Sequence, residues 1–290
     1  MTPRTGTWCL MFTVVLAVAG AVTVWPQAPQ PKLDLVIDRL MAYTGAYPEA
    51  LGRIVAEEHY EQRVRHSARS SDGHTAERLD VRITKAELGL AQVGREWVGI
   101  RDVVEVDGVA VPDAGRRLER ALAQPDSGDA VRAILRDNSR FNVEDSRIGR
   151  NINVPTMALE FLRPMHRWRF SFARDGEETG PDRRSLWRIR FRERQRPTLV
   201  RQVGGRDQPL RGLVWLDPAT GEVFKTDLSW ERGPVGSIMV TYGRVERITP
   251  LVPLTMSERY ADKDGASEIL GEARYSNFRQ FTTAGRLITP

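Results

Sequence analysis

The clearest pattern in the chain is the alternation of apolar and arginine residues in LWRIRFRER, residues 186–194. Trp187, Ile189 and Phe191 fall on one face of a strand, while the arginines between and after them fall on the other. In WRFSF, Trp168, Phe170 and Phe172 likewise share a face. A sheet with one dry and one wet face is typically antiparallel and covered on one side, whereas parallel sheets are apolar on both. The pattern therefore favours an antiparallel sheet over a doubly wound parallel fold.

Turn residues divide this half of the chain into successive strands. The segment LVWLDPATGEVFKTDLSW, residues 213–230, places Asp217-Pro218-Ala219-Thr220-Gly221 between two apolar runs, as a hairpin turn requires. We expect strands near 166–173, 185–194, 211–217, 222–230, 236–244, 252–261 and 268–281 to pair sequentially and antiparallel. Within them Trp187 should be buried and Arg188 exposed. Earlier in the chain, two long polar strands are expected between Arg53 and Val93, followed by a hairpin at Asp107-Gly108.

Helical periodicity is confined to a few segments. Residues 33–47 place Leu33, Val36, Ile37, Leu40 and Met41 on one face, and Pro48 is expected to limit this helix. Further helices are expected at 116–124, at 127–141 with Ser127 as N-cap, and between Pro155 and Pro164. The predicted fold class is α+β, a large curved antiparallel sheet forming an open half-barrel, with these helices covering one face.

The N-terminal residues bear on the compartment. MTPRTGTWCLMFTVVLAVAGAVT has one cation, no acid, and an apolar run that ends in Ala19-Gly20-Ala21. This favours a signal peptide, residues 1–21, and a periplasmic or secreted protein. An uncleaved membrane anchor is the alternative, because the run approaches the ~18 residues needed to cross a bilayer. Residues 22–32 are expected to be an extended linker and residues 33–290 a single domain.

No residue set indicates catalysis or metal binding. Cys9 is the one cysteine, so removal of the signal would exclude thiol chemistry and disulfides. The histidines are His59, His66, His74 and His166, and none of them has a metal-ligand spacing. Glu57 and Glu58 diverge on a strand, which does not suit paired acid–base work, and the chain has no nucleophile-elbow motif. We therefore expect a non-enzymatic protein without cofactor or metal.

Arginine suggests one kind of partner. Only four of the 43 basic residues are lysine, which a GC-rich genome would also explain. If strands near 166–173 and 185–194 pair, a basic patch forms from Arg167, Arg169, Arg188, Arg190 and Arg192. Such a patch could contact a membrane surface or an acidic partner; the alternative is a solvated face with acids on neighbouring strands. No long run of like charge indicates nucleic-acid binding.

The apolar face suggests a ligand site. Its residues are Trp168, Phe170, Phe172, Trp187, Ile189, Phe191, Val214 and Leu216. They could line an apolar cavity closed by the helices at 33–47 and 127–141, or they could form an ordinary core against those helices.

Two further motifs accompany the hairpin at 213–230, namely VPLTMSERYA, residues 252–261, and GEARYSNFRQF, residues 271–281. Together with the element order they resemble the periplasmic lipoprotein-carrier (LolA/LolB-like) superfamily and the uncharacterised secreted bacterial proteins grouped with it. The resemblance implies an open sheet with an apolar concavity that holds acyl chains under a helical lid, and it carries over no individual residue. The function expected is binding or carrying of a lipid, lipoprotein or other apolar ligand in the cell envelope. The alternative is a structural or protein-interaction module without a small ligand.

Overall fold

A computed structural model describes residues 30–288 of the chain, apart from 70–74, 94–95, 113, 115–116, 119, 121–127, 144–153, 203, 231–234, 263, 265 and 283–285. The predicted signal, residues 1–21, lies outside the described residues, as do most of the predicted linker and most of the helix expected at 116–124. The account below concerns the unit Pro31–Pro290.

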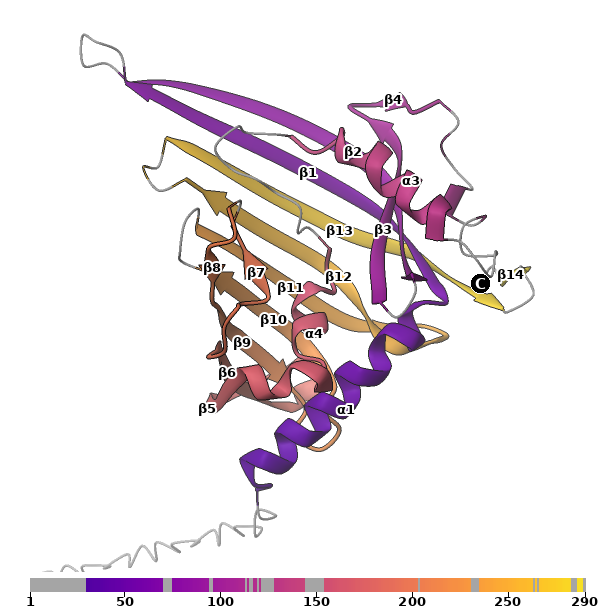
Figure 1. Ribbon diagram of the computed structural model, residues 1–290. Helices are drawn as coiled ribbons and strands as arrows, with labels where there is room; N and C mark the ends of the chain where they lie inside the picture. Colours follow the sequence, from indigo (N-terminus) through magenta and orange to yellow (C-terminus); the bar gives the residue numbers. More distant parts are fainter. Residues whose placement is uncertain are drawn as a thin grey trace, which may run out of the picture. The chain divides into compact units, whose positions relative to one another are not determined.

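The elements follow the order in Figure 1. They are α1 (Leu33–Leu51), β1 (Ile54–Arg69), β2 (Thr75–Val93), β3 (Glu96–Val106), β4 (Val109–Ala110), α3 (Gly128–Ser139), α4 (Met157–Phe161), η1 (Pro164–Arg169), β5 (Phe170–Thr179), η2 (Pro181–Arg183), β6 (Ser185–Glu193), β7 (Val200–Arg201), β8 (Asp207–Gln208), β9 (Leu210–Leu216), β10 (Val223–Trp230), β11 (Val235–Val245), β12 (Ile248–Ala261), β13 (Ser267–Thr282) and β14 (Arg286–Ile288).

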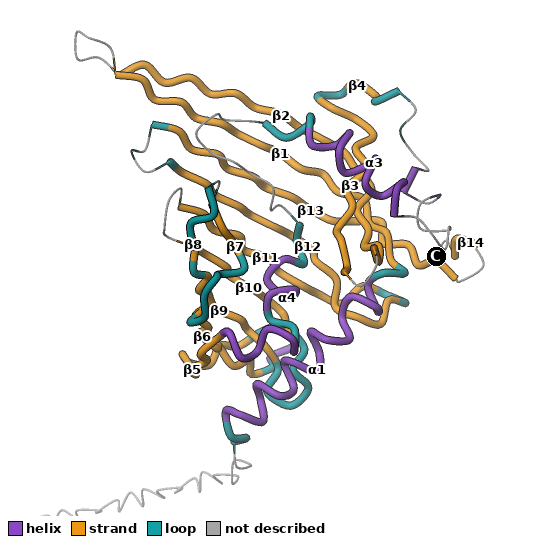
Figure 2. The backbone as a smooth tube through the Cα atoms, in the orientation of Figure 1, coloured by secondary structure: helices purple, strands orange, loops and turns teal. Residues whose placement is uncertain are grey.

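One large antiparallel sheet dominates the described residues (Figure 2). Its strand order is β4-β3-β2-β1-β13-β12-β11-β10-β9-β6-β5, with β14 beside β13, and its two ends do not pair with each other. From β5 to β13 the strands of this sheet pair with their neighbours in sequence, which confirms the predicted sequential antiparallel order. The strand β13 also pairs with β1, beginning at Ile54↔Gln280, and so joins the N-terminal strands to this meander.

One face of the sheet is dry across the middle of its strands, and we call it the inner face. A single row of pairing partners crosses eight strands there, and each member is at most 1% exposed. The row is Ile189, Val214, Thr226, Val240, Met256, Ala273, Tyr60 and Thr84. The apolar face of α1, with Val36, Ile37 and Leu40, belongs to the same core cluster, as does Leu159 of α4. The inner face is therefore the interior predicted from the alternating pattern.

The helix α3 lies against the opposite, outer face. Its residues Val131 and Ile134 form a second core cluster with Val55 and Ile100, which face away from Ala56 and Leu88 of the main core. The expectation that all helices cover one face is therefore wrong in part. An apolar stripe on a helix shows that one side of the helix is buried, but it does not show which face of a sheet will receive it. The open antiparallel sheet is confirmed, while helices make up only a small part of the described fold.

The turn at Asp217–Gly221 is also a contact with α1. Gly221 has φ of +80°, as predicted for a left-handed turn position. Arg39 Nη1 of α1 donates a hydrogen bond of 2.6 Å to the carbonyl oxygen of Pro218. A Cβ atom on Gly221 would lie 2.8 Å from the backbone nitrogen of Leu40 and closer still to the carbonyl of Arg39. Glycine therefore lets the turn rest directly on the helix backbone.

Two local expectations need correction. Pro48 lies inside α1, which ends three residues later at Leu51, so the helix continues for most of a turn past the proline. The segment expected as a strand from residue 166 is instead the 3-10 helix η1 as far as Arg169, and the strand β5 begins at Phe170. The proline at the start of η1 fixes φ at a helical value, and this local preference prevails over the alternating pattern.

Candidate functional site

The predicted ligand-binding stripe is mostly packed interior. Trp187, Ile189 and Phe191 of β6 and Val214 and Leu216 of β9 are at most 3% exposed, and Phe170 of β5 is 8% exposed. The Phe170 and Phe191 rings meet edge to face with their centroids 5.9 Å apart. Trp187 is buried as predicted, whereas Arg188 is half-buried and not exposed.

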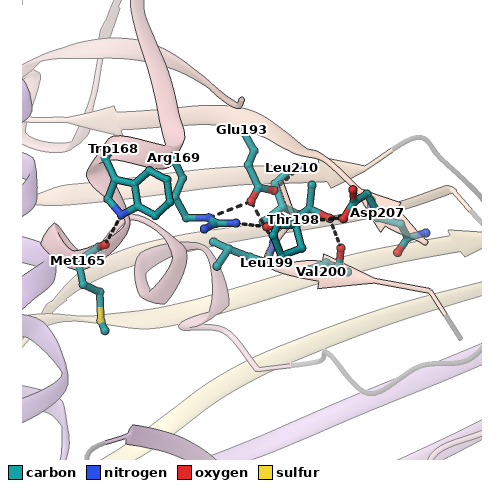
Figure 3. A network of polar contacts seen from close by, with 11 residues as sticks. Met165, Trp168, Arg169, Glu193, Thr198, Leu199, Val200, Asp207 and Leu210 are labelled. Carbon is teal, nitrogen blue, oxygen red and sulfur yellow. Dashed lines mark hydrogen bonds and ion pairs between the residues drawn. The ribbon is translucent and has the colours of Figure 1, made fainter. Parts of the chain in front are cut away.

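Trp168 does not share this face, because it lies on η1 and is 63% exposed. Its indole nitrogen donates to the carbonyl oxygen of Met165 at 3.1 Å (Figure 3). Together with Ile37, Phe170 and Phe172, the Trp168 side chain borders an open surface groove of about 560 Å³. Two members of the predicted stripe, Phe170 and Phe172, therefore reach both the interior and this groove.

A buried carboxylate organises the neighbouring segment, as Figure 3 shows. Glu193, at the end of β6, is 4% exposed and accepts hydrogen bonds from the backbone nitrogens of Leu199 at 2.9 Å and Leu210 at 3.2 Å. The Nε atom of Arg169 donates to the same carboxylate at 3.3 Å. Glu193 thus links η1, the residue before β7 and the first residue of β9 through hydrogen bonds.

The predicted arginine patch is divided and partly neutralised. Arg188 and Arg190 lie on β6 beside the carboxylate of Asp175, to which Arg188 Nε is 2.7 Å. Arg167 and Arg169 lie on η1, where they pair with Asp38 and Glu193 respectively. Arg192 is exposed on the outer face, opposite Arg211 of β9. The sheet pairing expected for the patch is present, but acids on β5 and α1 accompany most of its charges.

An apolar cleft of about 320 Å³ lies where α1, β3, α3 and α4 meet. Tyr47 and Pro48 of α1, Leu90 of β2, Trp97, Val98 and Gly99 of β3, Leu135 of α3, and Val154, Thr156, Met157, Leu159 and Glu160 line it. Its volume is near the lower end of the range for small-molecule pockets. The lining is apolar with one charged residue, Glu160, which forms an ion pair of 2.8 Å with Arg163.

Close backbone contacts shape this cleft. A Cβ atom on Gly99 would lie 2.7 Å from Cγ1 of Val154, so glycine lets the segment before α4 approach β3. A small apolar space of about 20 Å³ adjoins the cleft, lined among others by Leu51, Ala56 and Leu88. The cleft and this adjoining space share Leu90, Gly99, Val154 and Thr156. The side chain of Val154 therefore borders both spaces.

The inner face also carries a buried polar network that the sequence analysis missed. Glu58 of β1 and Arg101 of β3 form a two-pronged ion pair, with Arg101 Nη2 2.7 Å from Glu58 Oε1. The Arg101 guanidinium lies over the ring of Tyr60 at 4.8 Å.

On the same face, Glu258 of β12 accepts hydrogen bonds from the hydroxyls of Tyr60 and, at 2.8 Å, Tyr260. Burial raises the pKa of the Tyr275 hydroxyl well above its usual range. Glu58, Tyr60 and Gln62 occupy alternate positions of β1 and are buried, while the residues between them are exposed or half-buried. In the sequence, however, all of these positions are polar or aromatic, so the alternation does not stand out.

The described residues offer no metal centre, since no group of three or more histidine, cysteine or acidic side chains is gathered among them. His66 lies 3.9 Å from Asp80, and burial lowers the pKa of His166. His74 lies outside the described residues. Across the described ranges, no helix has both the length and the apolar character needed to span a membrane.

Known proteins show a similarity to this chain in structure and none in sequence. No known family and no curated protein matches the chain in sequence. Among solved structures, the chain is similar to a LolA superfamily protein from Nitrosomonas europaea, with 11% sequence identity and a TM-score of 0.32 over 85% of this chain and 94% of that one. At this TM-score nothing about family, ligand or activity is transferred to this chain.

Proposed function

We propose that this protein is a non-enzymatic binding protein of the cell envelope that holds an apolar ligand, such as an acyl chain, in the cleft between α1, β3, α3 and α4. The observation that carries the proposal is the cleft itself, with its apolar lining and its one acidic residue already paired to Arg163. A ligand there would be recognised through apolar contact and not through charge.

The size of the cleft and its apolar lining favour a narrow apolar ligand. Trp97, Leu135 and Met157 are each only partly buried, so a ligand would cover apolar surface that now faces solvent. Each buried methylene contributes about 0.8 kcal/mol, so eight of them contribute about 6 kcal/mol. Association costs about 4 kcal/mol or more in lost freedom, so a short chain should bind weakly. A longer chain would gain a little more if Val154 moved aside and opened the adjoining space of about 20 Å³.

Leu135→Asp tests this proposal, because it places a charge in the lining of the cleft. The matched control is Leu35→Asp, which makes the same change on α1 at a position that is 45% exposed. Binding of a fluorescent fatty acid should be lost in Leu135→Asp and unchanged in the control, with both variants keeping the wild-type near-ultraviolet circular dichroism. Equal binding by both variants, or no binding by the wild-type protein, would contradict the proposal.

Val154→Ala tests the depth of the site. Shortening this side chain should join the cleft to the adjoining space, so that longer acyl chains gain more affinity than short ones. Titration with a series of fatty acids measures the gain per methylene. A uniform loss across the series would indicate that Val154 only supports the fold.

The membrane contact predicted for the arginines is a separate part of this proposal. Arg192 supports it as an exposed cation on the outer face, while the pairing of Arg188 and Arg190 with Asp175 weakens it. Co-sedimentation with vesicles containing phosphatidylglycerol measures such a contact directly. The alternative function, a protein-interaction module of the envelope, is favoured by the edge of β2 at residues 77–82, which no described strand covers.

A further inference from the structure

The strand β2 has an edge that no described strand covers over its first half. It pairs with β1 from Thr75 to Gly89, but its pairing with β3 begins only at Thr84. Residues Glu77 to Arg82 therefore have a strand partner on one side only, among the described residues. In Figure 1 this part of β2 lies at the border of the sheet, beyond β3 and β4. Free edges of this kind are templates for pairing with another chain.

The backbone groups that face this edge can be assigned from Ile83. Its carbonyl oxygen accepts from the nitrogen of Asp107 at 2.8 Å, and its nitrogen donates to the Asp107 carboxylate at 2.8 Å. Both backbone groups of Ile83 thus point to the β3 side. The β1–β2 register has no irregularity from Thr75 to Gly89, so the backbone groups of Val81, Leu79 and Glu77 point to the same side.

The side chains along this edge include two exposed apolar residues on the outer face and charged residues on the inner face. Leu79 is 61% exposed and Val81 is 49% exposed, on the outer face. On the inner face Arg78 and Asp80 alternate with them, and Arg78 Nε is 3.1 Å from Asp80. An exposed apolar pair beside backbone that no described strand pairs is unusual, because native edges are generally blunted by charge, proline or cover.

We propose that this edge pairs with the same edge of a second copy of the chain, antiparallel and centred on Leu79. This inference goes beyond the proposed ligand binding and does not rest on it. A two-fold axis through residue n places residue n opposite itself and residue n−1 opposite n+1 of the partner. The charges along β2 can therefore be used to compare the registers that symmetry allows.

Only one register satisfies both the charges and the backbone. Centring on Glu77, Arg78, Asp80 or Arg82 places a charged residue opposite its own copy, which is unfavourable. Centring on Val81 requires the backbone of Ile83, which Asp107 already occupies. Centring on Leu79 places each Arg78 opposite an Asp80 and the two Leu79 side chains together. It also engages the backbone of Glu77, Leu79 and Val81, which all face the edge.

Cysteine substitution tests the register. Directly opposed residues in a hydrogen-bonded antiparallel pair have Cα atoms about 5.5 Å apart, within reach of a disulfide. In a Cys9→Ser background, Leu79→Cys should therefore give a covalent dimer under a mild oxidant. Val81→Cys is the matched control, because its two copies would be four residues out of register, about 14 Å apart. Cross-linking of both variants alike, or of neither, would overturn the proposal.

Proline substitution and charge reversal test the edge without cysteine. Val81→Pro removes an outward N–H and leaves the β1 pairing intact, so it should keep the wild-type melting temperature and weaken dimerisation at least tenfold in analytical ultracentrifugation. Asp80→Pro removes an N–H that points toward β1, so it breaks a hydrogen bond within the sheet and should lower the melting temperature instead.

Arg78→Asp should weaken the dimer through repulsion by the partner's Asp80, and adding Asp80→Arg should restore it. A wild-type chain that stays monomeric at high micromolar concentration, or a dimer that Val81→Pro and Arg78→Asp leave unchanged, would overturn the inference. Capture of an unrelated peptide by the edge, without self-association, would also overturn it.

Discussion

The contribution of the contact between the Asp217–Gly221 turn and α1 to stability can be tested with two glycines, of which only one is packed against other residues. Gly221 and Gly108 both have positive φ, +80° and +83°. A Cβ atom on Gly108 would meet nothing within 4 Å, whereas one on Gly221 would overlap the backbone of Arg39 and Leu40. Replacing either glycine with alanine therefore adds the same backbone strain, but only Gly221→Ala forces the turn away from the helix.

The expected magnitudes differ accordingly. An alanine held in the left-handed region costs about 1–2 kcal/mol, and this cost is common to both variants. Separating the turn from α1 also breaks the 2.6 Å hydrogen bond from Arg39 to Pro218, which as a bond to a charged donor contributes about 1.5–3 kcal/mol. Gly221→Ala should thus lower the free energy of unfolding by about 3–5 kcal/mol and Gly108→Ala by about 1–2 kcal/mol.

Urea unfolding of both variants measures this difference, provided that the dependence of stability on urea is unchanged. In an Arg39→Ala background, Gly221→Ala should cost less than it does alone, because the hydrogen bond is already absent. Equal losses for the two glycine variants would refute the reasoning, since they would show that strain alone sets the cost and that the turn does not support α1.

Two further perturbations concern ionisable groups that are buried or half-buried. Arg101→Met leaves the Glu58 carboxylate buried without its cation and should cost about 3–5 kcal/mol in urea unfolding, whereas Arg101→Met with Glu58→Leu should recover most of that loss; an equal loss in the double variant would contradict this. Burial lowers the pKa of His166, so the unfolded chain takes up the proton first and stability should fall as the pH drops below about 6.5, the usual histidine value. The slope of melting temperature against pH should be shallower in His166→Gln, and an unchanged slope would assign the pH dependence to other groups.

The sequence predicted the part of the fold in which local signals agree. From β5 to β13, alternating residues and turn residues such as Asp217 and Gly221 specify both the strands and their order. The Asp107-Gly108 hairpin likewise forms with both residues at positive φ. In these segments the strand pattern, the turn chemistry and the burial of one face all indicate the same structure, which is why they could be derived without coordinates.

The candidate site could not be placed in the same way. The alternating pattern identified Ile189 and Phe191 as buried, but burial alone does not distinguish a filled core from a cavity. The cleft depends instead on how closely Val154 approaches Gly99 and on where α3 packs, and both are long-range contacts. The polar network was missed because Glu58 in an otherwise polar strand resembles a solvated residue until its partner Arg101 is placed beside it.

The pairing of β1 with β13 means that the sheet can be completed only after nearly the whole chain has been made. Ile54 pairs with Gln280, so the two ends of this contact are separated by 280 − 54 = 226 residues. At about 5–20 residues per second, β1 would be made roughly 10–45 s before the strand that pairs with its second edge. Until then a long edge of β1 is open to other chains, and contacts between such distant residues are slow to form. A chain that stops before Ser267 would have the rest of its meander and its N-terminal hairpin but no strand to join them, so the sheet is complete only when its last long strand is in place.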